Sequence, residues 1–215
     1  MFTKNTLGWS IVVAILLGGL AGYYLATNPV VNNIALGTSK QVALYGQMRK
    51  LWSDHVFWTR QYMIEAINES PEAAASATRL MENQENIGDA VIPFYGAQAG
   101  SHLTELLKQQ ITIIVDLVEA TKSKNQPDFQ DANIRWQNNA AQIAMFLSQL
   151  NPNWPEVAVA DLMKIHLSTT ADELSAIVNQ QYNMSVTSFD AVHDHILSMS
   201  DALSAGIIKQ FPDKF

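Results

Sequence analysis

Apolar residues recur every three or four positions along most of this chain, which is the spacing of one face of an α-helix. The first such stripe lies within residues 40–70 and contains Leu44, Met48, Leu51, Trp52, His55, Trp58, Tyr62 and Ala66. No segment shows the strict alternation of apolar and polar residues that is typical of a half-buried strand. The pattern therefore predicts an all-α domain.

Clusters of proline, glycine and asparagine separate the stripes. Ser70-Pro71 predicts the start of a second helix over about 72–92, which Pro93 and Gly96 end. Ser101 is the predicted cap of a third helix. Further breaks bound helices at about 128–150, 156–180 and 187–211. Long helices joined by short turns pack as antiparallel neighbours, so we expect an up-down bundle of four to six helices.

The N-terminal segment follows a different pattern. No charged residue lies between Lys4 and Lys40, and residues 7–26 form an apolar run of 20 residues. A helix of that length would span about 30 Å, the thickness of a bilayer core. The chain is therefore expected to comprise an N-terminus at 1–6 on the cytoplasmic side, a transmembrane anchor at 7–26, a linker at 27–39 and a helical-bundle domain at 40–215.

A cleaved signal peptide is the alternative interpretation of this run. Gly19 and Ala21 would be the small residues before the cleavage site. The apolar run continues to Ala26, beyond that site, which favours a retained anchor. Gly18 and Gly22 form a GxxxG pair, which would give the anchor a face for protein partners in the membrane.

Charge and cysteine content exclude several classes of function. Residues 61–215 carry eight basic and nineteen acidic residues. Nucleic-acid binding needs clustered Lys and Arg, so this acidic body argues against it. The chain has no cysteine, which excludes disulfides, thiolate metal sites and cysteine catalysis.

Several polar side chains interrupt the apolar stripes and are candidates for a site. Inward Asp, Glu and His on facing helices can bind iron, manganese, zinc or copper in a bundle core. The candidate metal ligands are His55, Glu85, Asp89, His166, Glu173, His193 and His195, of which a subset would converge. No helix carries a Glu-x-x-His pair, and the alternative is that these groups are buried and bonded to neighbouring helices.

The chain contains no nucleophile elbow, P-loop or dinucleotide-binding fingerprint, so we predict no catalytic residues. The sequence therefore favours a non-catalytic accessory, scaffold or sensor-like subunit of an envelope complex. The alternative is a metal-binding or metal-dependent redox protein. A third hypothesis is an apolar ligand held between the helices, for which a cavity of roughly 300 Å³ or more is needed.

Five stretches together resemble a family of bacterial helical proteins without an established activity. They are His55-Val-Phe-Trp-Thr-Arg60, Asn83-Gln-Glu-Asn-Ile-Gly88, Pro93-Phe-Tyr-Gly96, Trp136-Gln-Asn-Asn-Ala140 and Gly206-Ile-Ile-Lys-Gln-Phe-Pro-Asp-Lys-Phe215. The resemblance covers about residues 50–215 and implies a bacterial origin and an autonomous helical domain. With the predicted anchor, it implies a single-pass protein of the bacterial inner membrane whose bundle is periplasmic or otherwise extracytoplasmic.

Overall fold

The computed structural model describes residues 37–215, which form α-helices and one 3₁₀ turn and contain no strand. The elements are α2 (Ser39–Ile67), α3 (Ala73–Tyr95), α4 (Ala97–Lys122), α5 (Gln126–Leu150), α6 (Glu156–Val178), α7 (Tyr182–Gln210) and η1 (Pro212–Lys214). For residues 37–215, the predictions of an all-α domain and of a bundle of four to six helices are confirmed.

The predicted N-terminus at 1–6, the anchor at 7–26 and the Gly18–Gly22 face lie outside the described residues. From residue 37 onward, no helix combines the length and the apolar character that crossing a membrane requires. The expected location of the chain in a membrane therefore stays a prediction.

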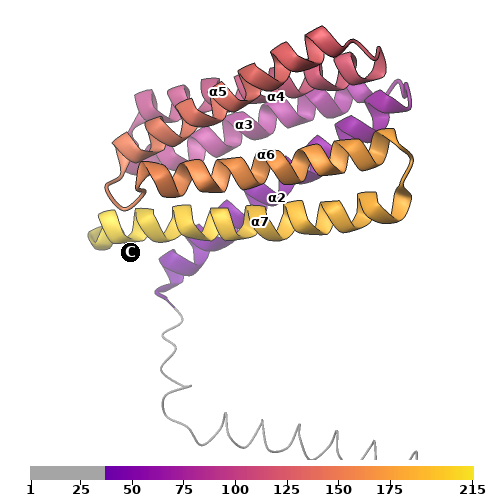
Figure 1. Ribbon diagram of the computed structural model, residues 1–215. Coiled ribbons are helices and arrows are strands. Elements are labelled where there is room, and N and C mark those ends of the chain that lie inside the picture. The colour runs from indigo at the N-terminus through magenta and orange to yellow at the C-terminus, as the bar shows by residue number, and fades with distance from the viewer. Residues whose placement is uncertain (1–36) are drawn as a thin grey trace, which may run out of the picture. The chain divides into compact units, whose positions relative to one another are not determined.

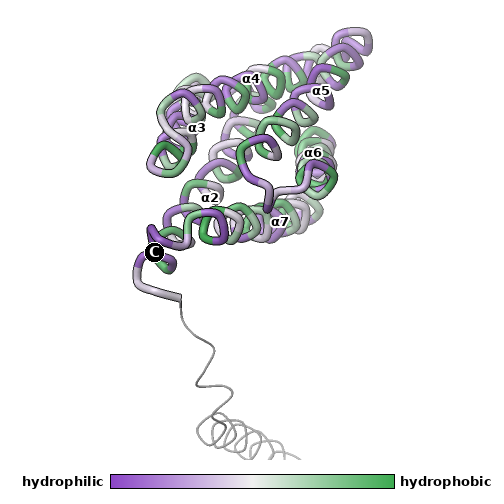
Figure 2. Tube along the Cα trace, turned by 90° about the vertical axis from the view of Figure 1, so that its left-hand side faces the viewer, coloured by the Kyte–Doolittle hydropathy of each residue, from purple (hydrophilic) through white to green (hydrophobic). Residues whose placement is uncertain are grey.

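The helices of the bundle form a closed ring. Each helix packs against the next one along the chain, and α7 returns to pack against α2. Figures 1 and 2 show this arrangement from two sides, with α3, α4 and α5 together and α2 running obliquely behind α6 and α7 in Figure 1. We call the contact between α2 and α7 the closing seam.

Polar contacts follow the closing seam in antiparallel order. They are Arg49 Nε donating to Asp201 Oδ1 at 2.6 Å, Ser53 Oγ lying 3.2 Å from His193 Nε2, and Arg60 Nη1 donating to the Ser185 carbonyl at 3.0 Å. Each pair joins residues more than a hundred positions apart. These contacts fix the register of α7 on α2.

Three of the turns share one geometry and contain no glycine at the helix end. The residues with positive φ are Glu69, Lys124 and Gln180, at 56°, 52° and 54°. In each turn the next N–H bonds to a carbonyl five positions earlier, as in Gln181 N to Ala176 O at 2.9 Å. This Schellman pairing ends α6 and lets α7 begin at Tyr182, whereas the sequence pattern predicted a start at Thr187.

Ser101 lies inside α4, so the prediction that it caps this helix is wrong. Helix α4 begins at Ala97 because Gly96 adopts a φ of 84° and reverses the chain within one residue. Pro93 does not end α3 but lies in its last turn, where the missing N–H removes a single hydrogen bond. The chain therefore passes from α3 to α4 through Gly96 alone, without a loop between Pro93 and Ser101.

Trp154 fills the end of the bundle at the α5–α6 connection. It inserts from the loop into the core, is 4% exposed and packs directly on Gly206 of α7. Asn151 Nδ2 donates to the Tyr95 hydroxyl at 2.9 Å, and that hydroxyl donates to Gln210 Oε1 at 2.9 Å. Two of the resembling stretches, around Tyr95 and Gly206, therefore meet here as packing elements.

Gly206 is expected to tolerate no side chain. A Cβ at this position would lie 1.9 Å from Trp154 Nε1, so Gly206→Ala must displace the indole ring. We expect the free energy of unfolding to fall by about 1–3 kcal/mol, as for other overpacked cores. Urea unfolding of the full chain, followed by circular dichroism, measures this change.

Gly46 provides the matched control for this prediction. It is exposed in α2, and a Cβ there would meet nothing within 4 Å. Gly46→Ala should therefore raise the free energy of unfolding by about 0.5–1 kcal/mol, through helix propensity alone. Equal stability of Gly206→Ala and the wild type would contradict the close packing of Trp154.

Candidate functional site

A row of imidazole rings lies where α2, α6 and α7 meet. His55 from α2 and His166 from α6 are both buried, with ring centroids 5.5 Å apart. His195 from α7 lies 6.4 Å from His166, and the planes of these two rings differ by 20°. We call His55, His166 and His195 the imidazole row. The prediction that His55 and His166 point into the bundle is confirmed.

The hydrogen bonds of the row differ from ring to ring. His195 Nε2 lies 2.9 Å from the Leu162 carbonyl and donates to it, which joins α7 to α6. The Nδ1 atoms of His55 and His166 are shielded from solvent and have no hydrogen-bond partner among residues 37–215. A charged imidazole would need a partner at both nitrogens, so this environment favours the neutral form.

Burial also shifts the proton equilibrium of these two rings. It lowers the pKa of His55 to about 4, and the neighbouring Gln84 side chain opposes the shift. Burial lowers the pKa of His166 well below its ordinary value, and the neighbouring His55 and His195 act in the same direction. Both rings are therefore neutral near pH 7 and resist protonation in the folded chain.

Glu173 forms a buried ion pair with Arg60. Its Oε1 accepts from Arg60 Nη1 and its side chain is 1% exposed. Burial raises the pKa of Glu173, and the Arg60 guanidinium opposes that rise. Arg60 also donates to the Ser185 carbonyl and lies over the Phe189 ring, 5.0 Å from its centroid. One guanidinium thus joins α2, α6 and α7.

The other candidate ligands lie apart from this row. His193 contacts Ser53 across the closing seam, 3.2 Å away. Glu85 and Asp89 are exposed, and Glu85 is paired with Lys108 of α4. Their predicted place in the apolar stripe of α3 is wrong, because that helix turns Leu80, Ile87 and Val91 inward instead.

The seven predicted ligands do not form one centre. Among residues 37–215, no three histidine or carboxylate side chains are grouped so that they could hold a metal ion. His55, His166 and His195 are neighbours, Glu173 binds Arg60, and the other three lie elsewhere on the bundle. The geometry therefore gives no support to a metal or redox site built from these residues.

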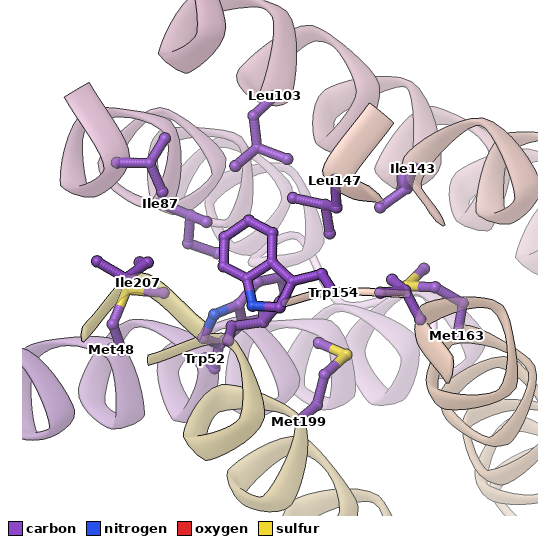
Figure 3. A pocket seen from close by; sticks show the side chains of 13 residues that line it. Met48, Trp52, Ile87, Leu103, Ile143, Leu147, Trp154, Met163, Met199 and Ile207 are labelled. Carbon is purple, nitrogen blue, oxygen red and sulfur yellow. The ribbon is translucent and has the colours of Figure 1, made fainter. Parts of the chain in front are cut away.

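The centre of the bundle is filled by its own side chains. The cavity between Trp52 and Trp154 has a volume of about 20 Å³ and is lined by apolar residues and the two indole rings (Figure 3). A volume of roughly 10–15 Å³ already corresponds to one water molecule. Trp52 and Trp154 therefore do not enclose a ligand chamber.

A hollow on the surface was missed by the sequence analysis. It lies on the closing seam, has a volume of about 310 Å³ and is lined by Ser53, Asp54, Phe57, Phe189, Asp190 and His193. Phe57 is 50% exposed and falls outside the apolar stripe of its helix. A large aromatic residue off the core stripe was the signal that could have indicated this surface.

Comparison of the chain with protein-family models, with curated proteins and with solved structures gives no significant match. The resemblance to a bacterial helical family therefore depends on the five sequence stretches alone.

The buried imidazoles predict that the fold is labile to acid. The pKa of His55 is about 4 in the folded chain and 6.5 in its ordinary state, so the unfolded chain binds more protons between these values. Stability should be complete above pH 6.5 and fall toward pH 4. Each buried histidine contributes a slope of up to about 1.4 kcal/mol per pH unit.

Urea unfolding of the full chain at a series of pH values measures this slope. His55→Leu should remove its share of the slope, and the double variant with His166→Leu should remove both shares. Substitution of the exposed His102 by Gln should keep the steep slope because both buried imidazoles remain. An unchanged slope in the double variant would show that other groups cause the pH dependence.

Proposed function

We propose that this chain is a membrane-tethered, extracytoplasmic helical domain that acts as a non-catalytic accessory subunit of an envelope complex. Its partner protein docks on the surface of α2 and α7 around the hollow at the closing seam. The observation that carries the proposal is the exposure of large apolar side chains on this surface beside acidic groups. Phe57, Val186 and Tyr182 are 50%, 57% and 75% exposed.

The exposed apolar residues of α7 continue the hollow along one helix face. Phe189 lines the hollow together with Phe57, and Val186 and Tyr182 lie three and seven positions earlier. Residues at these spacings share a face of an α-helix. An apolar stripe beside a concave surface is typical of a site that receives part of another protein.

The charges around the hollow indicate the kind of partner. Asp54 and Asp190 line it, and Asp54 is already paired with Lys50 and Arg79. The exposed Asp190 is available to pair with an opposite charge on the partner. Together with the acidic composition of residues 61–215, this favours a partner with a basic, amphipathic surface.

The predicted anchor would keep this surface close to the membrane. The apolar run ends at Ala26, and the first helix of the bundle begins at Ser39, so 12 residues separate them. Even a fully extended segment of this length spans at most about 43 Å. The partner is therefore expected to be a membrane protein or a protein held at the same membrane.

A photoreactive amino acid at Phe57 tests this proposal in intact cells. We expect irradiation of cells that carry the full chain to give one adduct of defined mass, because the side chain is exposed at the proposed interface. The adduct should stay in the membrane fraction after alkaline washing. Asp190→Arg, which reverses the charge at the hollow, should reduce the adduct at least about tenfold.

Ile134 on α5 is the matched control position. It is 59% exposed and lies outside the hollow, so the same photoreactive group there should give no defined adduct. Equal adducts from both positions would indicate unspecific contact. Loss of the chain from the alkali-washed membranes would contradict the tether, whether or not an adduct forms.

A further inference from the structure

A groove between α4, α5 and α6 is a second concave surface, separate from the closing seam. In Figures 1 and 2, α5 and α6 lie near each other at their connection and diverge toward the opposite end. The groove lies at this divergence and has a volume of about 240 Å³. Its lining consists of Leu117, Thr121, Phe129, Asn133, Trp136, Ala171, Leu174, Ser175, Val178 and Asn179.

The lining contains no charged side chain, which restricts what it can bind. Transfer of an ionised ligand into it would remove water from the charge without supplying an opposite charge. Apolar side chains from all three helices line it, including Leu117, Phe129 and Leu174. The groove therefore suits a neutral and mostly apolar molecule.

Trp136 adds a buried indole ring to this lining. It is 4% exposed, and its Nε1 has no hydrogen-bond partner in the part of the chain that the structure describes. A buried donor without a partner costs free energy, and most such groups in proteins are paired. Because this atom is shielded from solvent, a molecule in the groove meets the ring of Trp136 and not its donor.

Two polar groups of the lining use a donor within the chain. Asn179 Nδ2 donates to the Ser175 carbonyl at 2.8 Å, so the amide oxygen of Asn179 stays free to accept. Thr121 Oγ1 donates to the Leu117 carbonyl at 2.6 Å, which leaves the lone pairs of this hydroxyl free to accept a hydrogen bond. A hydroxyl group on a bound molecule can donate to the amide oxygen of Asn179.

We propose that the groove between α4, α5 and α6 binds a small neutral ring compound that carries a hydroxyl group. The volume of about 240 Å³ is below the range of drug-sized sites, which begins at about 300 Å³, so one or two fused rings fit. The rings pack against Phe129 and Leu174, and the hydroxyl donates to Asn179 Oδ1. This binding goes beyond the proposed function and does not depend on it.

Fluorine NMR of the full chain tests this proposal with 2-naphthol as the probe. The chain has five tryptophans, which can be replaced uniformly by 5-fluorotryptophan. We expect a saturable shift of the Trp136 signal, which is assigned by its loss in Trp136→Phe. 2-Naphthoate, a charged molecule of similar shape, should bind at least about tenfold more weakly because the lining holds no opposite charge.

Two alanine substitutions separate the groove from the rest of the surface. Ala171 and Ala202 are both exposed on helices, and only Ala171 lines the groove. Ala171→Phe should abolish the shift of the Trp136 signal, whereas Ala202→Phe should retain it. Because both sites are exposed, both variants are expected to keep the helical content of the wild type.

Three results would overturn the proposal. They are the absence of a saturable Trp136 shift, an equal shift in Ala171→Phe, and equal affinity for 2-naphthol and 2-naphthoate. A change of oligomeric state on Ala171→Phe without an effect of 2-naphthol would assign the groove to a second copy of the chain instead. The photoreactive group at Phe57 tests the closing seam, and the fluorine NMR tests the groove. The outcome of one experiment therefore does not determine the outcome of the other.

Discussion

The return of α7 to α2 is the constraint on which the rest of the bundle depends. Every other large contact joins helices that follow each other along the chain, whereas this one joins the first and last α-helices of residues 37–215. Arg60 stabilises it, because its guanidinium binds the buried Glu173 of α6 and the Ser185 carbonyl of α7 at once. Removal of one partner from such a buried pair leaves an uncompensated charge, which costs about 3–5 kcal/mol. Closure of the ring buries His55 and His166 and creates the hollow on the closing seam.

Sequence alone was sufficient to predict the helices wherever breakers mark their ends. Asn151-Pro-Asn-Trp-Pro155 separates α5 from α6 as expected. The α6–α7 turn was not predictable in this way, because Gln180 adopts a positive φ without glycine or proline. The turn at Gly96 was misplaced because a single residue reverses the chain there. The first turn carries no local signal, whereas at the second the glycine is the signal and only the start of the next helix was placed too late.

For the candidate site, helix periodicity was the only guide that the sequence offered to which side chains face inward. Periodicity placed His55, His166 and Glu173 inward, and all three are buried. It could not predict that Glu173 pairs with Arg60, because 113 positions separate them and only the closed ring brings them together. Nor did it exclude Glu85 and Asp89, which share the helical register of Met81 but face solvent. A core histidine and a ligand histidine have the same sequence pattern.

Amide hydrogen exchange of the full-length chain tests the closure of the ring most directly. If the ring closes as a unit, the central amides of α7 should exchange as slowly as those of α4, because both open only when the whole bundle unfolds. Glu173→Ala should then lower the protection of all the helices together. Fast exchange of α7 in the wild type, with α3, α4 and α5 still protected, would contradict the account, because the bundle would then persist without its closing helix.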